Sequence, residues 1–176
     1  MAKKFIILDT ETTGLEVRQG HKIIEIGAVV LNDRKKSSDH FHAYINPGRL
    51  IDEEASKVHG ITNQDLENEP MFAAIADDFI EFIQGSTLII HNAPFDVGFL
   101  NSELKAVSAK YPKLEDICEI EDSLVIARSK FPGQRNSLDA LANRFEVSGY
   151  DRSFHGALLD ANICLLYTSP SPRDAT

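Results

Sequence analysis

The chain has 176 residues, of which 43% are hydrophobic and 26% are charged, so it can bury the core of one ordinary globular domain. Its net charge of −9, from 18 basic and 27 acidic side chains, argues against a protein that coats a nucleic-acid backbone. No apolar run is long enough to cross a bilayer, and the apolar stretch behind Met1–Lys4 meets Asp9 too early for a secretion signal, so we expect a cytoplasmic protein.

The first part of the chain predicts an antiparallel meander of three strands. Residues 4–10 form a short apolar run between lysine and a stretch of threonine and glycine, as in a buried strand. Residues 23–31 are apolar and rich in β-branched side chains, which favours a second strand. Residues 32–39 have the composition of a charged turn, and residues 41–45 alternate apolar and polar positions until Asn46-Pro47-Gly48 ends a third strand.

The apolar period becomes helical after this meander. Apolar side chains recur at helical spacing over residues 72–83, and Gly85 follows where the end of a helix is expected. Residues 87–90 predict a fourth strand, and residues 91–94 predict a loop before a helix that begins at about Phe95.

Three more helices are expected in the last third of the chain. Asp122 or Ser123 is a suitable cap for a helix that runs to about Lys130, and Asn136 or Ser137 is a suitable cap for the next. The last helix begins near Gly156. Because strands come first and then alternate with helices, we expect a central mixed sheet with helices packed on it.

The C-terminal end differs from the rest of the chain in composition. Pro170 and Pro172 stop the last helix, and nothing in residues 168–176 can be buried. This stretch resembles sequence-assembly read-through more than a natural ending, although a native flexible tail is the alternative. We therefore expect residues 1–166 to form the folded domain and residues 167–176 to be a non-native or disordered tail.

Four acidic residues occupy positions at which apolar residues would be expected. Side chains alternate along a strand, so Asp9 and Glu11 face the same side, roughly 6–7 Å apart, and repel unless a cation lies between them. Asp96 follows the fourth predicted strand, at a junction where open α/β sheets bind ligands. Asp160 lies on a helix whose neighbouring residues are small or apolar. Taken singly, the Asp9–Glu11 pair also fits a solvated strand end, and Asp160 also fits a solvated helix face.

The donor types indicate which cation these acids would hold. Cys118 and Cys164 sit in no metal-binding spacing and are expected to be free thiols, so the ligands are oxygens. Oxygen ligands suit Mg²⁺ or Mn²⁺ rather than zinc, and two such ions would clamp the attacking and leaving oxygens of a phosphoryl displacement. His155 lies five residues before Asp160 and is a competent general base for water, although a loop histidine is more often polar surface. The residues therefore predict metal-assisted phosphodiester hydrolysis.

Three motifs, "FIILDTETTGL", "HNAPFD" and "HGALLDA", resemble the three exonuclease motifs of the DEDDh group. The likeness extends through "GHKIIEIGAVV", "VHGIT", "DSLVIARSKFPGQRNSLDALANRF" and "RSFHGALLDA" to the proofreading (epsilon) subunits of bacterial DNA polymerase III, over roughly residues 4–163. This resemblance implies a ribonuclease H-like α/β fold with a mixed five-stranded sheet and helices packed around it. It also implies 3′→5′ removal of nucleotides as 5′-monophosphates.

The resemblance also implies a role for each site residue. Asp9, Glu11 and Asp160 would bind the first metal, and Asp9 would bridge to the second. Asp96 would act mostly through metal-bound water, and His155 would take the proton of the attacking water.

The resemblance also implies contacts with the terminal nucleotide. They are made by Thr12, Thr13, Gly14, Val58, His59, Asn92 and Phe95. His59 and His91 fit a structural role in their loops as well.

The resemblance further implies a substrate and protein partners, and it leaves two alternative functions open. The substrate would be a single-stranded or frayed DNA 3′ end, and a small accessory subunit could bind. In the family a C-terminal tether binds the polymerase catalytic subunit, and here Leu166-Tyr167 run into the proline-rich end instead. The alternatives are an RNA 3′-end trimming enzyme of the same group, such as ribonuclease T or an oligoribonuclease, and a non-catalytic polymerase-associated scaffold. The presence of all five site residues favours an enzyme.

Overall fold

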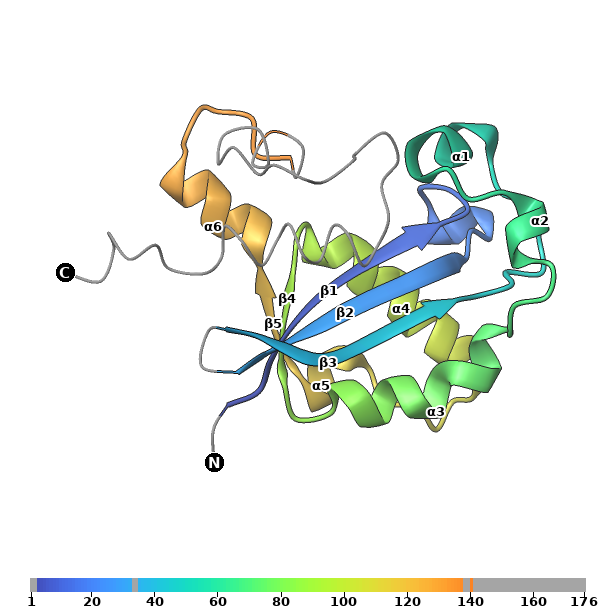
Figure 1. Cartoon of the computed structure of the whole chain (residues 1–176), viewed down its shortest axis with the longest axis horizontal. Coiled ribbons are helices and arrows are strands. Elements are labelled where there is room, and N and C mark those ends of the chain that lie inside the picture. Colours follow the sequence, from blue (N-terminus) through green and yellow to red (C-terminus); the bar gives the residue numbers. More distant parts are fainter. Residues whose placement is uncertain (1–2, 33–34, 138–139, 141–176) are drawn as a thin grey trace.

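The structure is a computed structural model that describes residues 3–32, 35–137 and 140. Within these residues, five strands form one mixed sheet in the order β3-β2-β1-β4-β5 (Figure 1). The strands are β1 (Phe5–Thr12), β2 (Ile23–Asn32), β3 (Lys35–Tyr44), β4 (Thr87–Ile90) and β5 (Glu119–Asp122). β1, β2 and β3 are antiparallel neighbours, and β4 runs parallel to β1 and to β5. The predicted meander and the mixed five-stranded sheet are confirmed.

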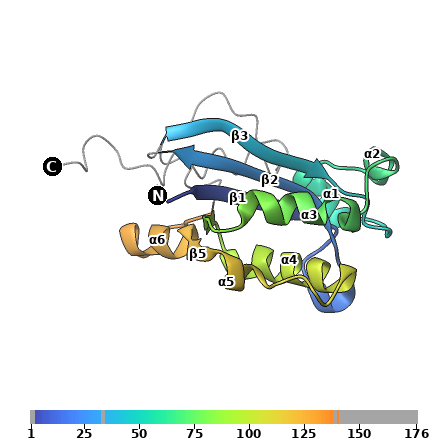
Figure 2. The ribbon, with the colours of Figure 1, turned by 90° about the horizontal axis from the view of Figure 1, so that it is seen from below.

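Within the described residues, all helices but the last lie in the connections between strands, and the last follows β5. They are α1 (Glu53–His59), α2 (Asn63–Leu66), α3 (Phe72–Ile83), α4 (Ala93–Val107), α5 (Leu114–Ile117) and α6 (Ser123–Lys130), with a short 3₁₀ turn η1 (Val17–Gln19). α3 and α4 lie side by side along the sheet (Figure 2). No helix within the described residues is long and apolar enough to span a bilayer.

Most of the predicted charged turn proved to be strand. β3 begins at Lys35, and the register pairs Asn32 with Lys35 and Leu31 with Lys36, so the prediction for residues 32–39 is wrong. Among the described strands, β3 lies at the edge of the sheet beside β2, and charged side chains are common on edge strands because they discourage pairing with other molecules. The alternation of apolar and polar residues therefore does not reveal the first half of β3.

The longer elements agree more closely with the predictions from the sequence. α3 buries Phe72, Ala76, Phe79 and Ile83 at the predicted spacing, and Gly85 follows it with φ 77°. The side chain of Asp122 accepts a hydrogen bond from the backbone N–H of Leu124, as predicted for the cap of α6.

Other boundaries differ from those predicted. α4 begins at Ala93 rather than Phe95, because Pro94 is tolerated in the first helical turn. The short elements α1, α2, α5 and β5 were not predicted, since each is too brief to show a period.

The two faces of β1 belong to different parts of the core. Ile6 and Leu8 pack with α3 and α4 in the larger apolar cluster. Ile7 packs on the opposite face with Val29 and with Ala127 of α6. Because side chains alternate along a strand, Asp9 and Glu11 belong to the face of Ile7, and Thr10 belongs to the face of α4.

Several predictions fall outside the described residues. These are the last helix near Gly156, Cys164, the domain boundary at residue 166 and the tail over residues 167–176. Cys118 lies within the described part and is a buried free thiol, as expected. Ser137 accepts a hydrogen bond from the backbone N–H of Ala140 at 3.1 Å, but the helix predicted to follow Asn136 or Ser137 lies outside the described residues apart from Ala140.

Candidate active site

β1 carries two acids, Asp9 and Glu11, near its C-terminal end, past the point where β1 pairs with β4. The parallel pairing with β4 stops at Ile7, whereas β1 continues to Thr12. On the other side, Asp9 is half-buried and lies opposite Gly27 of β2. Glu11 is 9% exposed and lies opposite Glu25. The predicted common face of the two acids is consistent with this register.

Asp96 reaches β1 from the first turn of α4. Its Oδ1 accepts hydrogen bonds from the backbone N–H of Thr10 at 3.1 Å and from the Thr10 hydroxyl at 2.6 Å. Since β4 ends at Ile90, the carboxylate takes the place of a strand partner at this edge of β1. The structure therefore brings Asp96 to the residue that stands between Asp9 and Glu11.

Burial changes the acid strength of Asp96. Its side chain is 3% exposed, and desolvation is the main cause that raises its pKa to about 7, with the negative charge of Asp122 adding to the rise. The hydrogen bonds from Thr10 act in the opposite direction because they favour the ionised form. A cation beside this carboxylate would favour the ionised form strongly.

The donor set fits a hard divalent cation, although only part of it is described. Asp9, Glu11 and Asp96 offer carboxylate oxygens, the donors that Mg²⁺ and Mn²⁺ prefer. Among residues 3–32, 35–137 and 140, no group of three or more His, Cys, Asp or Glu side chains is arranged to hold a metal ion. The fourth predicted ligand, Asp160, and the predicted base, His155, lie outside the described residues.

Asp122 has a second role that the sequence did not indicate. Besides capping α6, its carboxylate accepts hydrogen bonds from the backbone N–H of Asn92 at 3.0 Å and of Ala93 at 3.1 Å. Asn92 has φ 64°, a left-handed conformation that is unusual for a residue with a side chain. The carboxylate of Asp122 thus links the start of α4, which carries Asp96, to the start of α6 through hydrogen bonds.

His91 takes part in the same junction between β4 and α6. Its Nδ1 lies 3.2 Å from the hydroxyl of Ser123, and its Nε2 lies 2.8 Å from the carbonyl oxygen of Asn136. Burial lowers the pKa of this imidazole. These contacts support the structural role that the sequence left open for His91.

The loop after β1 is held from several sides. The Thr12 hydroxyl donates to the carbonyl of Gly14 at 2.6 Å, and Nε2 of His59 lies 3.2 Å from the Thr12 carbonyl. Nδ1 of His59 accepts a hydrogen bond from the backbone N–H of Ile61 at 3.1 Å, so both ring nitrogens are bonded within the protein. His59 is 6% exposed, whereas Val58 is 47% exposed. Both contacts with a terminal base stay predictions, and the geometry favours Val58 for that role.

The last two predicted contact residues differ in exposure. Phe95 is partly buried, and its ring lies against that of Phe99 with the centroids 4.9 Å apart. Asn92 is exposed at the start of α4. Neither position tests the predicted contact with a nucleotide.

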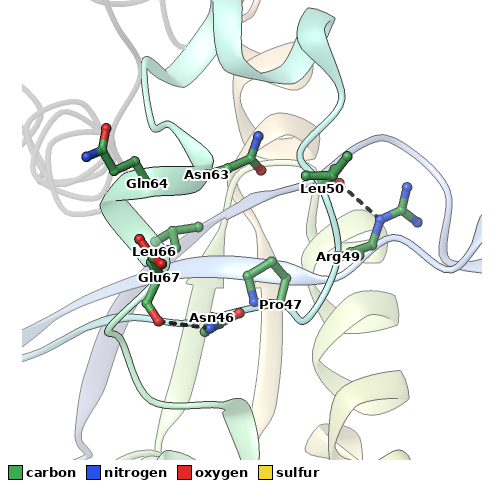
Figure 3. A pocket seen from close by; sticks show the side chains of 8 residues that line it. All are labelled: Asn46, Pro47, Arg49, Leu50, Asn63, Gln64, Leu66 and Glu67. Atoms are coloured by element: carbon green, nitrogen blue, oxygen red, sulfur yellow. Dashed lines mark hydrogen bonds between the residues drawn. The ribbon is translucent and has the colours of Figure 1, made fainter.

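A cavity of about 330 Å³ lies between the loop after β3 and α2 (Figure 3). It is lined by Asn46, Pro47, Arg49, Leu50, Asn63, Gln64, Leu66 and Glu67. The side-chain amide of Asn46 donates to the Glu67 carbonyl across it at 3.3 Å. No predicted catalytic or nucleotide-contacting residue lines this cavity, so it is not the candidate active site.

Comparisons by sequence and by structure list different individual proteins, and both the matching family model and the similar solved structures are exonucleases. The exonuclease family model RNase_T matches residues 6–167. DNA polymerase III subunit epsilon of Escherichia coli (strain K12) is 49% identical over 162 residues, which cover 90% of this chain and 67% of that protein. The same subunit of Rickettsia typhi is 54% identical over 156 residues, which cover 89% and 68%. The chain thus spans about two thirds of the length of these relatives.

Solved structures agree with this picture. Exonuclease X in complex with 5′ overhanging duplex DNA has a TM-score of 0.70 at 26% identity, over 93% of this chain and 89% of that one. E. coli exonuclease I in complex with a dT13 oligonucleotide has a TM-score of 0.78 at 16% identity, over 96% and 40%, which is a likeness of fold.

Proposed function

The chain belongs to the exonuclease family whose model matches residues 6–167, and we propose that it is a proofreading exonuclease that removes nucleotides from the 3′ end of DNA. The observation that carries this proposal is the likeness to epsilon subunits of DNA polymerase III, at 49% and 54% identity over about nine tenths of the chain. The ribonuclease H-like sheet and the acids at the end of β1 support it.

The chemistry is hydrolysis of the terminal phosphodiester. Asp9, Glu11, Asp96 and Asp160 would hold two divalent cations, Mg²⁺ or Mn²⁺. When bound, the cations supply positive charge to the attacking and leaving oxygens of the phosphate. His155 would accept the proton of the attacking water.

Within the described part, Thr10 has a supporting role in this chemistry. Its two hydrogen bonds orient the Asp96 carboxylate and favour its charged form, which is the form that binds a cation.

The substrate would be a single-stranded or frayed 3′ end. The loop of Thr12, Thr13 and Gly14 would receive the terminal nucleotide, with Val58 against its base. A mispaired end unstacks at lower cost than a paired one, so selectivity for errors requires few contacts with base edges. The protein would act in the cytoplasm beside a polymerase catalytic subunit, with a small accessory subunit as a further partner.

A matched set of substrates tests the proposal. The full chain with Mn²⁺ is incubated with single-stranded DNA and RNA of one sequence, each labelled at the 5′ end, and the products are separated by length. Stepwise shortening of DNA from the 3′ end, faster than that of RNA, is expected. Equal rates would favour the RNA-trimming alternative. Absence of products from either strand would favour the non-catalytic scaffold.

A further inference from the structure

Thr13, in the loop after β1, is fully buried and hydrogen-bonded to two other segments of the chain, residues 21–22 and Asp52. Its backbone N–H donates to the carbonyl of Lys22 at 2.9 Å, and its carbonyl accepts from the backbone N–H of Asp52 at 2.9 Å. Its hydroxyl oxygen accepts from the backbone N–H of Lys22 at 3.1 Å and lies 2.9 Å from Nδ1 of His21. The start of β2 and the start of α1 therefore hold this residue from two sides, where the end of β1 points toward α1 (Figure 1).

The chemistry of His21, Asp52 and Thr13 indicates which atoms donate and which accept in these hydrogen bonds. Nε2 of His21 lies 3.3 Å from Oδ2 of Asp52, and a carboxylate only accepts hydrogen bonds, so Nε2 carries the proton. In the neutral form of the ring Nδ1 is then an acceptor, to which the Thr13 hydroxyl donates. The hydroxyl oxygen remains able to accept from Lys22. A continuous set of hydrogen bonds thus forms a relay that runs from Asp52 through His21 to Thr13.

The ring of His21 also supports the next residue of the loop. A Cβ added to Gly14 would lie 2.3 Å from Cε1 of His21 and 2.4 Å from each of the two ring nitrogens. This spacing shows that the backbone of Gly14 rests directly on the imidazole. His21 is itself 5% exposed, so the ring is enclosed between the loop and the body of the protein.

Arg49 holds the outer end of the relay. Its Nη2 lies 3.7 Å from Oδ1 of Asp52, and its Nη1 donates to the carbonyl of Gln19 at 3.2 Å. The carboxylate of Asp52 is therefore placed between a guanidinium on one side and the imidazole of His21 on the other. Such outer contacts orient the group that acts on the site.

We propose that His21 is a positioning residue for the terminal nucleotide of the substrate. With Asp52 it fixes the side chain and backbone of Thr13, and its ring sets the position of Gly14, so the loop is ordered before substrate arrives. The proposal rests on the proposed function, in which this loop receives the 3′ nucleotide. The hydrogen bonds and ion pairs described for Asp52, His21 and Thr13 go to residues other than Asp9 and Glu11, so we expect loss of the relay to affect binding of the 3′ end more than the hydrolytic step.

Initial rates on single-stranded DNA, with thermal unfolding measured in parallel, test this inference. His21→Phe fills the same space without ring nitrogens and is expected to raise KM about tenfold with kcat within about twofold. His40→Phe, the same change at an exposed histidine of β3, is the matched control and leaves KM unchanged. Thr13→Val is expected to raise KM to a similar extent, and Thr13→Ser to stay closer to the original protein than Thr13→Val.

The double variant His21→Phe with Thr13→Val separates a relay from two independent contacts. A relay is already broken by either change, so KM of the double variant is expected to match that of the worse single variant. A KM raised about a hundredfold, or an unchanged KM in the folded single variants, would overturn the proposal.

Asp52 provides the test if changes at the buried positions prevent folding. Its side chain is 52% exposed. Asp52→Asn keeps an acceptor for Nε2 of His21, whereas Asp52→Ala removes it. KM is expected to rise with Asp52→Ala and to rise less with Asp52→Asn. Equal effects of the two changes would contradict the relay. An inactive unmodified protein would instead refute the proposed function, so the two failures are distinct.

Discussion

The carboxylate of Asp96 completes the edge of β1 at Thr10, where β4 no longer reaches. Oδ1 of Asp96 lies 3.1 Å from the backbone nitrogen of Thr10 and 2.6 Å from its hydroxyl oxygen. This relationship joins the start of α4 to the strand that carries Asp9 and Glu11. It makes Thr10 part of the site although its own side chain faces away from the two acids of β1.

Replacing Thr10 with valine tests this link. Thr10→Val keeps the shape of the side chain and removes the hydroxyl donor, so the charged form of Asp96 is stabilised less. The Mn²⁺ concentration for half-maximal activity is expected to rise about tenfold. Thr87→Val is the matched control, because the Thr87 hydroxyl also donates to a carboxylate, that of Glu119 at 3.2 Å, at the opposite end of the sheet. A metal requirement that rises equally in both variants would contradict the role of Thr10.

The raised pKa of Asp96 predicts how stability depends on pH in the absence of metal. The folded protein holds a proton on Asp96 up to about pH 7, whereas the unfolded chain releases it near 3.8. The folded state therefore binds more protons between these values, and its stability falls as pH rises from about 4 to 7. Asp96→Asn removes this slope and is expected to be more stable at pH 8 by on the order of 2 kcal/mol.

Chemical denaturation in EDTA at a series of pH values measures this effect. Asp78→Asn, an exposed carboxylate on α3, serves as the control and should keep the slope of the original protein. If Asp96→Asn has the same pH dependence as the original protein, Asp96 does not titrate in the predicted range.

Asp122 predicts a linked loss of stability and activity. Asp122→Ala removes the acceptor for the N–H groups of Asn92, Ala93 and Leu124, and we expect a loss of about 2–3 kcal/mol of unfolding free energy. The start of α4 becomes less well fixed, so activity should fall further than the unfolded fraction accounts for. Asp116→Ala, at an exposed acid of α5, is the comparison. Full activity per folded molecule in Asp122→Ala would show that the start of α4 is held by other contacts.

Substitutions of Val58 and His59 are predicted to have different effects, the first on substrate binding and the second on stability. His59 is buried and bonded through both ring nitrogens, so His59→Ala should lower the unfolding temperature. Val58 is exposed, so Val58→Ala should leave the unfolding temperature unchanged and raise KM for a 3′ end severalfold. Parallel melting and rate measurements on the two variants decide between these roles. An unfolding temperature of His59→Ala equal to that of the original protein would favour a direct contact with the base.

The sequence predicted elements whose side chains repeat with a clear period and whose length lets that period be seen. α3 is such an element, since its buried positions follow one another at helical spacing. β2 was predicted instead from its apolar, β-branched composition, and it is buried from Ile23 to Leu31. The first half of β3 is strand because β2 pairs with it, which no local composition reveals. α1 and α5 are too short for a period to be recognised.

The same contrast holds at the site. The common face of Asp9 and Glu11 follows from the alternation of a strand, and the position of Asp96 follows from the loop after β4. The bonds of Asp96 to Thr10 and of Asp122 to Asn92 join residues that are 86 and 30 positions apart. Such contacts depend on how the whole chain packs, and the residue types involved are equally common as caps or surface groups.

Binding of Mn²⁺ to the metal-free protein, measured by titration calorimetry, tests most directly whether β1 and α4 contribute to one cation site. The full chain is compared with Asp9→Asn, with Asp96→Asn and, as a control on exposed β3, with Asp39→Asn. We expect each of the first two changes to weaken Mn²⁺ binding at least about tenfold while the control binds as the original protein does. Equal Mn²⁺ affinity in all four folded proteins would show that these acids do not hold the cation.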